Sequence, residues 1–125
     1  MIAVGTARGV VLVVDDDREV SGTLADILED AGYYVMVAGD GAEALALLRR
    51  GPRPSLVLLD LRMPGMDGFQ FQAEKRRDPA LEDIPVVVFT ADRTSAPQAE
   101  ELDIAAYVEK PARLEELLAI VHRFH

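Results

Sequence analysis

The stretch Val10-Val11-Leu12-Val13-Val14-Asp15-Asp16-Asp17 decides the fold, because a continuous apolar run rich in β-branched residues ends abruptly in three carboxylates. Such a short apolar run is typical of a strand that is covered on both faces, as in a parallel sheet. Leu56–Leu59 and Val86–Phe89 have the same character, and Tyr34–Val37 and Ala105–Val108 are weaker candidates. The sequence therefore predicts five short strands.

Between these runs the apolar residues recur at the spacing of helices. The first helix has an apolar face from Val20 to Ala31, and Gly32 suits the position just after its end. Asp40 and Glu43 have the spacing of a capping box for the second helix. The other three helices are expected over Asp67–Arg77, over Ala96–Leu102 with Ser95 and Gln98 at its start, and over Leu114–Phe124. Five repeats of strand and helix predict an α/β fold with a doubly wound parallel sheet and helices on both faces.

Length and composition narrow the class of protein. The chain has 125 residues, half of them apolar, and a net charge of −9, which is the profile of one globular domain with no basic surface for direct contact with nucleic acid. It contains no cysteine, which excludes disulfides, a thiol nucleophile and a cysteine-bound zinc. The sequence shows no run long enough to span a membrane and no signal peptide, so we expect a cytoplasmic protein without membrane contact. Residues 1–9 are expected to form a flexible N-terminal lead-in.

Polar residues gather where the predicted strands end. Asp15 and Asp16 follow the first strand, Asp60 follows the third, Thr90 ends the fourth, and Lys110 follows the fifth. Ligand sites of doubly wound sheets form at the carboxyl ends of the strands, so these side chains should converge. Carboxylates without histidine or cysteine suit Mg²⁺ or Mn²⁺ rather than zinc. A carboxylate can also be the nucleophile that accepts a phosphoryl group, helped by a cation and a hydroxyl.

The motifs around these residues resemble the receiver domains of two-component signalling. The resemblance covers about residues 10–125 and is carried by Asp15-Asp16-Asp17, Asp60-Leu61-Arg62-Met63-Pro64-Gly65-Met66-Asp67-Gly68, Phe89-Thr90-Ala91 and Tyr107-Val108-Glu109-Lys110-Pro111. It implies a flavodoxin-like (βα)5 fold with strand order 2-1-3-4-5. It also implies that the domain is a switch rather than an enzyme acting on a separate substrate, and that a histidine kinase, a phosphotransfer protein or a small phosphodonor supplies a phosphoryl group to Asp60.

The resemblance also implies a role for each site residue. Asp15, Asp16, Asp60 and the backbone carbonyl of Arg62 would hold Mg²⁺ or Mn²⁺, and Lys110, followed by a cis bond to Pro111, would contact the phosphoryl group. Thr90 and Tyr107 would form the switch, with a half-buried core ring as the simpler alternative for Tyr107. Arg62 and Asp92, each two residues beyond a site residue, would face each other across the pocket mouth and tune the lifetime of the phosphoryl group. The face of the fourth helix, fifth strand and fifth helix would contact a partner, an attached domain or a second copy in a homodimer.

Simpler interpretations stand beside these. Asp17 is better placed as a helix N-cap than as a metal ligand. A metal-dependent phosphohydrolase with an aspartate nucleophile is a rival function, but phosphatases of the haloacid dehalogenase class carry a second aspartate where Arg62 stands here, and a guanidinium cannot serve as a general acid. A second rival is a binding module with the same fold that never takes phosphate. Loss of one of the acidic site residues or of Lys110 would indicate such a module. Mutual repulsion should raise the pKa of at least one of the three carboxyls in the metal-free protein.

Overall fold

The computed structural model describes residues 8–92 and 96–124. The chain alternates strands and helices in the order β1 Val10–Val14, α1 Arg18–Asp30, β2 Tyr34–Ala38, α2 Gly41–Arg50, β3 Leu56–Leu59, α3 Gly68–Arg77, β4 Val86–Thr90, α4 Ala96–Glu100, β5 Ala106–Glu109 and α5 Leu114–His122. All neighbouring strands pair in parallel, and their order across the sheet is β2-β1-β3-β4-β5. The predicted doubly wound, flavodoxin-like sheet with strand order 2-1-3-4-5 is therefore confirmed.

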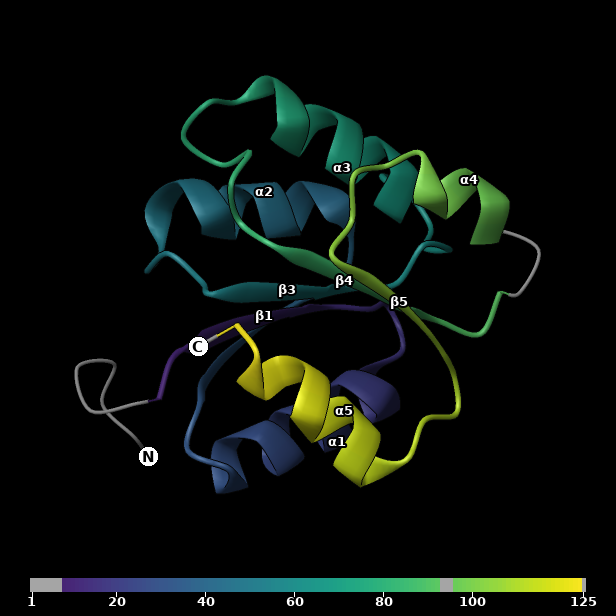
Figure 1. Cartoon of the computed structure of the whole chain (residues 1–125). Coiled ribbons are helices and arrows are strands. Elements are labelled where there is room, and N and C mark those ends of the chain that lie inside the picture. Colours follow the sequence, from purple (N-terminus) through teal and green to yellow (C-terminus); the bar gives the residue numbers. More distant parts are fainter. Residues whose placement is uncertain (1–7, 93–95, 125) are drawn as a thin grey trace.

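The helices cover both faces of the sheet, which explains why the inner strands are apolar up to their carboxyl ends. Helices α2, α3 and α4 lie on one face, and α1 and α5 lie on the other (Figure 1). Within β1, Leu12 and Val14 belong to the core on the α2 and α3 side, while Val11 and Val13 belong to the core on the α1 and α5 side. Every residue of β1, β3 and β4 is buried.

Most helix boundaries follow the predicted signals. Asp17 is the N-cap of α1, since its Oδ1 accepts hydrogen bonds from the amides of Glu19 and Val20 at 3.0 and 3.3 Å. Gly32 follows the end of α1 with a φ of 101°, a left-handed conformation that favours glycine. Asp67 caps α3 in a complete capping box with Gln70, so this segment is a helix as predicted.

Three local predictions were wrong in detail. The capping box of α2 is only half formed, because Asp40 accepts from the Glu43 amide while the Glu43 carboxylate accepts from the Gly39 amide instead of that of Asp40. Helix α4 ends at Glu100 rather than Leu102, since the chain tightens into a turn before Asp103, which has a φ of 58°. Strand β5 lies one residue later than predicted. Ser95 lies outside the described residues, as does most of the predicted lead-in.

Within residues 8–92 and 96–124, no helix combines the length and apolar character that a membrane crossing requires.

Candidate functional site

The turn after β1 gives its three aspartates three different positions. The Asp15 amide continues the sheet by donating to the Ala38 carbonyl at 3.0 Å, and the Asp15 side chain is only 3% exposed. Asp15 Oδ1 then accepts the amide of Asp17 at 2.9 Å, which bends the chain into α1. Asp16 is exposed and Asp17 caps the helix. Asp15 and Asp16 are therefore available at the carboxyl end of the sheet, while the Asp17 side chain caps α1.

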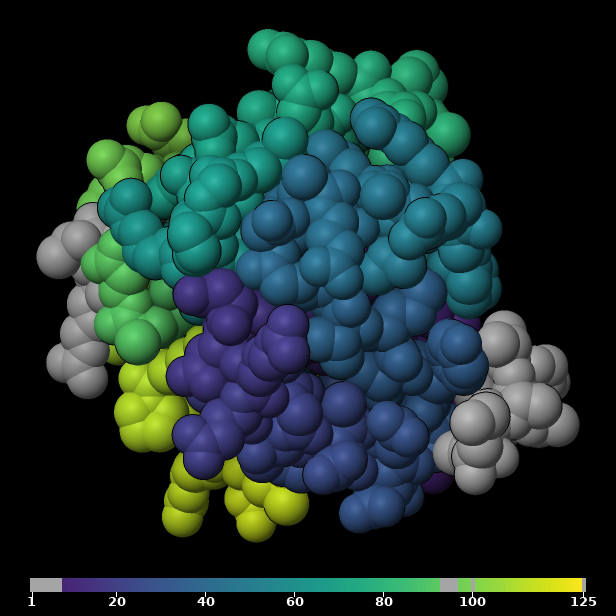
Figure 2. Space-filling view, turned by 180° about the vertical axis from the view of Figure 1, so that it is seen from behind, coloured from purple at the N-terminus to yellow at the C-terminus, as the bar shows by residue number. Residues whose placement is uncertain are grey.

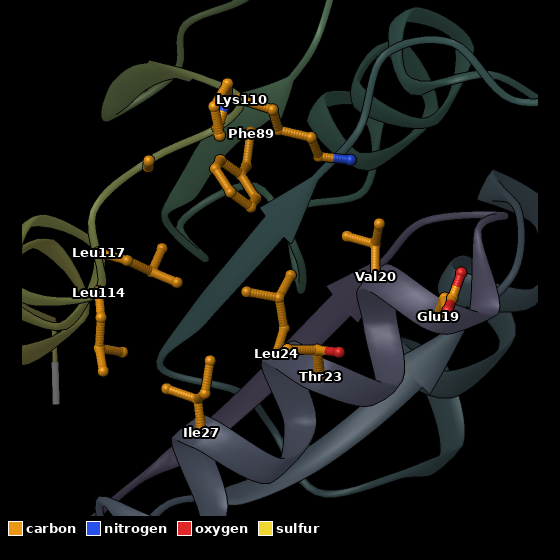
Figure 3. Close-up of a pocket in the computed structure, with 11 residues that line it drawn as sticks. Glu19, Val20, Thr23, Leu24, Ile27, Phe89, Lys110, Leu114 and Leu117 are labelled. Atoms are coloured by element: carbon orange, nitrogen blue, oxygen red, sulfur yellow. The ribbon is translucent and has the colours of Figure 1, made fainter.

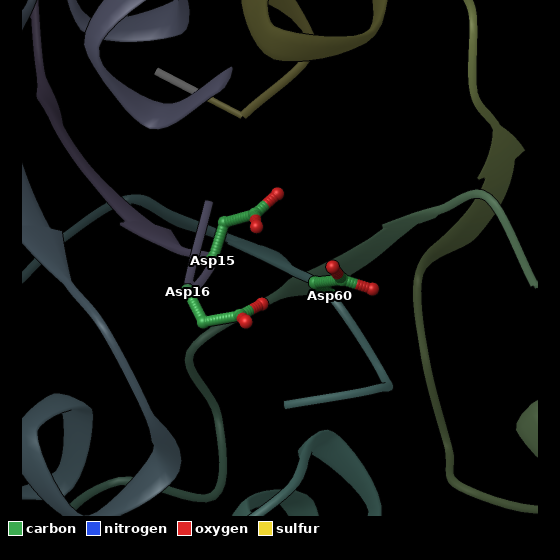
Figure 4. Close-up of side chains that lie close together, drawn as sticks. All are labelled: Asp15, Asp16 and Asp60. Carbon is green, nitrogen blue, oxygen red and sulfur yellow. The ribbon is translucent and has the colours of Figure 1, made fainter. Parts of the chain in front are cut away.

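Asp60 completes a group of three carboxylates. Its amide donates to the Val14 carbonyl at 2.9 Å, which sets the end of β3 beside the end of β1. Asp15, Asp16 and Asp60 each offer an oxygen within 4.8 Å of the others. Figure 4 shows the three side chains converging from the ends of these two strands. In the space-filling view from behind, surfaces from the purple, teal and green parts of the chain adjoin on one face (Figure 2).

A lysine and a threonine from the neighbouring strands complete the site. Lys110 Nζ lies 2.5 Å from Asp15 Oδ2 and 3.5 Å from Asp60 Oδ2, and the three side chains are 16%, 3% and 12% exposed. The Thr90 hydroxyl donates to Asp60 Oδ1 at 2.8 Å. Lys110 also lies over the ring of Phe89, and the bond that follows it, to Pro111, is cis.

Burial governs the electrostatics of Asp15. The pKa of the Asp15 carboxyl is raised above its usual value, mainly because burial disfavours the charged form. The hydrogen bond from Lys110, the amide of Asp17 and the lysine charge oppose this effect, and the charge of Asp60 contributes least. The predicted rise in pKa is therefore present, but the assumed cause, mutual repulsion of the carboxylates, is the smallest of its causes.

The donor set fits a hard divalent cation. Three carboxylates and one ammonium group leave two negative charges uncompensated when all four groups are ionised, and oxygen is the preferred ligand of Mg²⁺ and Mn²⁺. Arg62 meets the cluster through its backbone amide, which lies 3.4 Å from Asp60 Oδ1. The role of the Arg62 carbonyl as a metal ligand stays a prediction.

Arg62 and Asp92 face each other across the mouth of the site. Arg62 Nε lies 2.6 Å from Asp92 Oδ2, and the guanidinium lies over the ring of Phe69 at 5.4 Å from its centre. The hydrogen bond to Asp92 holds the pKa of Arg62 above its usual value. Tyr107 is half-buried and its hydroxyl donates to the Asp92 carbonyl at 2.8 Å, so this ring contacts both the core and the site loop.

The loop after Asp60 depends on two glycines. Gly65 has a φ of 73°, which favours glycine. A Cβ added at Gly68 would lie 2.5 Å from the carbonyl oxygen of Asp60 and 2.8 Å from Leu61 Cα, closer than any side chain tolerates. The sequence alone does not reveal that Gly68 packs against the Asp60 main chain.

Sequence reasoning missed the two phenylalanines beneath the cations. Phe89 lies under Lys110 and Phe69 lies under Arg62. Phe89 is hidden inside an apolar strand run, and Phe69 lies in the alternating start of α3, so neither position carries a signal beyond core packing.

An apolar groove opens beside Lys110, between α1 and α5. It has a volume of about 470 Å³, and its wall includes Val20, Leu24 and Ile27 of α1 and Leu114 and Leu117 of α5. Figure 3 shows these side chains pointing into the groove, with Phe89 and Lys110 at its upper end. Leu114 is 46% exposed, which is unusual for a large apolar side chain in this fold.

Comparison with known proteins identifies the family to which the chain belongs. A family model described as the response regulator receiver domain matches residues 11–122. The chain belongs to this family. Response regulator MprA from Mycobacterium sp. strain KMS is 42% identical over 111 residues, which are 87% of this chain and 47% of MprA. The receiver domain therefore spans about half the length of the curated relatives it matches.

Solved structures agree on the fold of the receiver domain. Chemotaxis protein CheY4 from Vibrio cholerae superposes with a TM-score of 0.85 at 29% identity, covering 95% of this chain and all of that one. The Mn²⁺-bound form of response regulator Rcp1 superposes with a TM-score of 0.76 at 31% identity, covering 92% of this chain and 90% of the other. Both the family model and the curated relatives place the receiver domain among response regulators.

Proposed function

We propose that this receiver domain accepts a phosphoryl group on Asp60, and that the resulting change regulates a partner or an attached domain. The observation that carries the proposal is the position of the Asp60 carboxylate. It lies between the hydroxyl of Thr90 and the ammonium group of Lys110 and within reach of two further carboxylates. A histidine kinase, a phosphotransfer protein or a small phosphodonor would supply the group.

The chain's own residues support the transfer step. A carboxylate oxygen of Asp60 attacks phosphorus, the bond from phosphorus to the donor breaks, and the donor leaves with the electron pair. Lys110 lies 3.5 Å from Asp60 Oδ2 and can follow the negative charge onto the phosphoryl oxygens. The Thr90 hydroxyl, which donates to Asp60 Oδ1 at 2.8 Å, can turn its proton to a phosphoryl oxygen instead.

Asp15, Asp16 and Asp60 are the residues that would hold Mg²⁺ or Mn²⁺. When bound, a divalent cation would supply charge neutralisation for the acidic site and for the incoming phosphoryl group. The chemistry of three oxygen donors supports this, and so does the Mn²⁺-bound Rcp1 structure, in which a similar protein binds such an ion.

A phosphodonor protein also needs a surface beside Asp60. The groove between α1 and α5 is apolar and reaches Lys110, so it offers such a surface next to the phosphoacceptor. The proposed regulatory output lies on another face, formed by α4, β5 and α5, where Tyr107 connects the strand to the site loop.

The phosphohydrolase alternative is less well supported. The position two residues after Asp60, which carries an aspartate in haloacid dehalogenase phosphatases, holds Arg62, and this side chain is paired with Asp92. All the acids and the lysine needed for phosphorylation are present and close together, which also argues against a module that never takes phosphate.

Acetyl phosphate and Mg²⁺ would test the proposal. We expect intact-protein mass spectrometry to find one added phosphoryl group, and peptide mapping to find it on Asp60. The Asp60→Asn variant should take none. Asp17→Asn is the matched control, because asparagine keeps the N-cap of α1 and removes a neighbouring carboxylate that the proposal does not use. An adduct at another residue, or an adduct that persists in Asp60→Asn, would refute the proposal.

A further inference from the structure

Asp92 takes part in three hydrogen bonds, each with a different residue. Its carboxylate accepts from Arg62 Nε at 2.6 Å, its amide donates to the Thr90 hydroxyl oxygen at 3.2 Å, and its carbonyl accepts from the Tyr107 hydroxyl at 2.8 Å. Because one residue makes all three bonds, a displacement of Asp92 as a whole affects all three.

Two chemical routes lead from Asp60 to this residue. The first runs from Asp60 Oδ1 through the Thr90 hydroxyl to the Asp92 amide. The second runs through Arg62, whose amide lies 3.4 Å from Asp60 Oδ1 and whose guanidinium holds the Asp92 carboxylate. The second route depends on charge, and Arg62 is 55% exposed and so retains room to move.

We propose that Arg62 is a positioning residue that couples the charge at Asp60 to Tyr107. This inference rests on the proposed function, since it begins with a phosphoryl group on Asp60. A phosphorylated Asp60 side chain carries close to two negative charges, whereas the resting Asp60 carboxylate and the Asp92 carboxylate each carry one. The new group therefore competes with Asp92 for the guanidinium. As Arg62 turns toward Asp60, the Asp92 carboxylate loses this ion pair, and the resulting shift of Asp92 weakens the hydrogen bond between its carbonyl and the Tyr107 hydroxyl.

The position of Phe69 supports this movement. The Arg62 guanidinium lies over the Phe69 ring at 5.4 Å, and the planar group can slide along a ring face without losing that contact. The contact between Arg62 and Asp92 is also weak, because an exposed ion pair changes an equilibrium by no more than about fivefold. A phosphoryl group can overcome a contact of that strength.

Nuclear magnetic resonance of Tyr107 would test the relay. With ¹³C-labelled tyrosine, the Tyr107 ring signal is assigned by its loss in Tyr107→Phe. We expect Arg62→Gln to move the resting signal toward its position in wild type loaded with beryllofluoride, a mimic of the phosphoryl group, through a shift in population of about twofold to fivefold. The remaining change on loading should be smaller than in wild type. Arg62→Lys, which keeps the charge, should restore most of the wild-type behaviour.

The comparison of resting proteins needs no phosphoryl group, so it tests the relay separately from phosphorylation. Arg50→Gln is the matched control, since it removes an exposed arginine from α2 on a different part of the surface. The relay is refuted if Arg62→Gln leaves the resting Tyr107 signal at its wild-type position, or if Arg50→Gln moves it equally. Failure of the proposed function has a different signature, namely a wild-type mass that acetyl phosphate does not change.

Discussion

Replacing Lys110 with methionine should destabilise the metal-free domain, and Mg²⁺ should repair most of the loss. Lys110 lies 2.5 Å from Asp15 Oδ2 and 3.5 Å from Asp60 Oδ2, and all three side chains are mostly buried. Methionine has a similar volume and no charge. The Lys110→Met variant therefore leaves a buried Asp15 carboxylate without its cation while changing the packing little.

The size of the effect follows from the burial of the pair. Removing one partner of a fully buried ion pair costs about 3–5 kcal/mol, and the 16% exposure of Lys110 lowers this to about 2 kcal/mol at neutral pH. In a domain of this size that corresponds to a fall in melting temperature of about 8 °C. The cost requires an ionised Asp15. The pKa of Asp15 is already raised by burial and rises further without Lys110, so the cost should shrink as the pH falls through that folded-state pKa.

Urea denaturation of wild type and variant, at neutral and acidic pH and with or without millimolar Mg²⁺, would measure this. Lys75→Met is the matched control, because Lys75 is the chain's other lysine, is 1% exposed, and donates to the Glu82 carbonyl instead of a carboxylate. Burial lowers the pKa of Lys75, so its replacement should cost little and should not respond to Mg²⁺. Equal losses in both variants, or a Lys110→Met loss that Mg²⁺ leaves intact, would contradict the electrostatic account of the site.

Three further predictions concern the Asp15 carboxyl, two glycines and the Arg62–Asp92 pair. In the metal-free wild type, the raised pKa of Asp15 means that the folded state keeps the Asp15 proton to a higher pH than the unfolded state does. The urea midpoint should therefore fall as the pH rises from the ordinary carboxyl pKa of 3.8 through the folded-state pKa. A midpoint that rises over this range would contradict the prediction. Gly22→Ala should stabilise the domain by about 0.5–1 kcal/mol, because Gly22 lies in the exposed middle of α1. Gly68→Ala should destabilise the domain by at least about 2 kcal/mol, because the added Cβ would lie 2.5 Å from the Asp60 carbonyl oxygen. Similar melting temperatures for the two variants would count against this packing. The rate at which the Asp60 phosphoryl group is lost should change in Arg62→Ala, in Asp92→Ala and in the double variant. The effects of the two single substitutions should not add, because the two side chains are paired at 2.6 Å. Strictly additive effects would exclude coupling between the two residues.

The architecture and the convergence of the candidate site residues could be predicted because both depend on simple regularities of the chain. Strands such as Val10–Val14 and Val86–Thr90 are buried on both faces, so their apolar character is continuous and easily recognised. Parallel strands end at one edge of the sheet, so the polar residues that follow them must meet. The convergence of Asp15, Asp60 and Lys110 follows from this rule without knowledge of side-chain geometry.

The details that failed depend on competition between nearby partners. Glu43 has the spacing of a capping-box residue, yet its carboxylate accepts from the Gly39 amide, which lies one position away from the expected donor. Mutual repulsion was the obvious reason for a raised carboxyl pKa, but Lys110 lies between Asp15 and Asp60 and leaves burial as the main cause. Such choices depend on the geometry of the side chains, which the order of residues does not encode.

The end of α4 shows why a local misprediction can matter for function. Gln72, a residue of α3 that is 1% exposed, donates through Nε2 to the carbonyls of Leu102 and Asp103 at 2.8 and 3.3 Å. This buried amide fixes the turn in which Asp103 takes its positive φ, and it ties the exit from α4 to α3. Asp92, which precedes α4 in the chain, is bound to the half-exposed Arg62 and to the Tyr107 hydroxyl. Buried hydrogen bonds resist exchange with water better than exposed ion pairs do, so the Gln72 contacts are firmer than the Arg62–Asp92 contact. A change of charge at Asp60 should therefore displace Asp92 while Gln72 holds the exit from α4 in place.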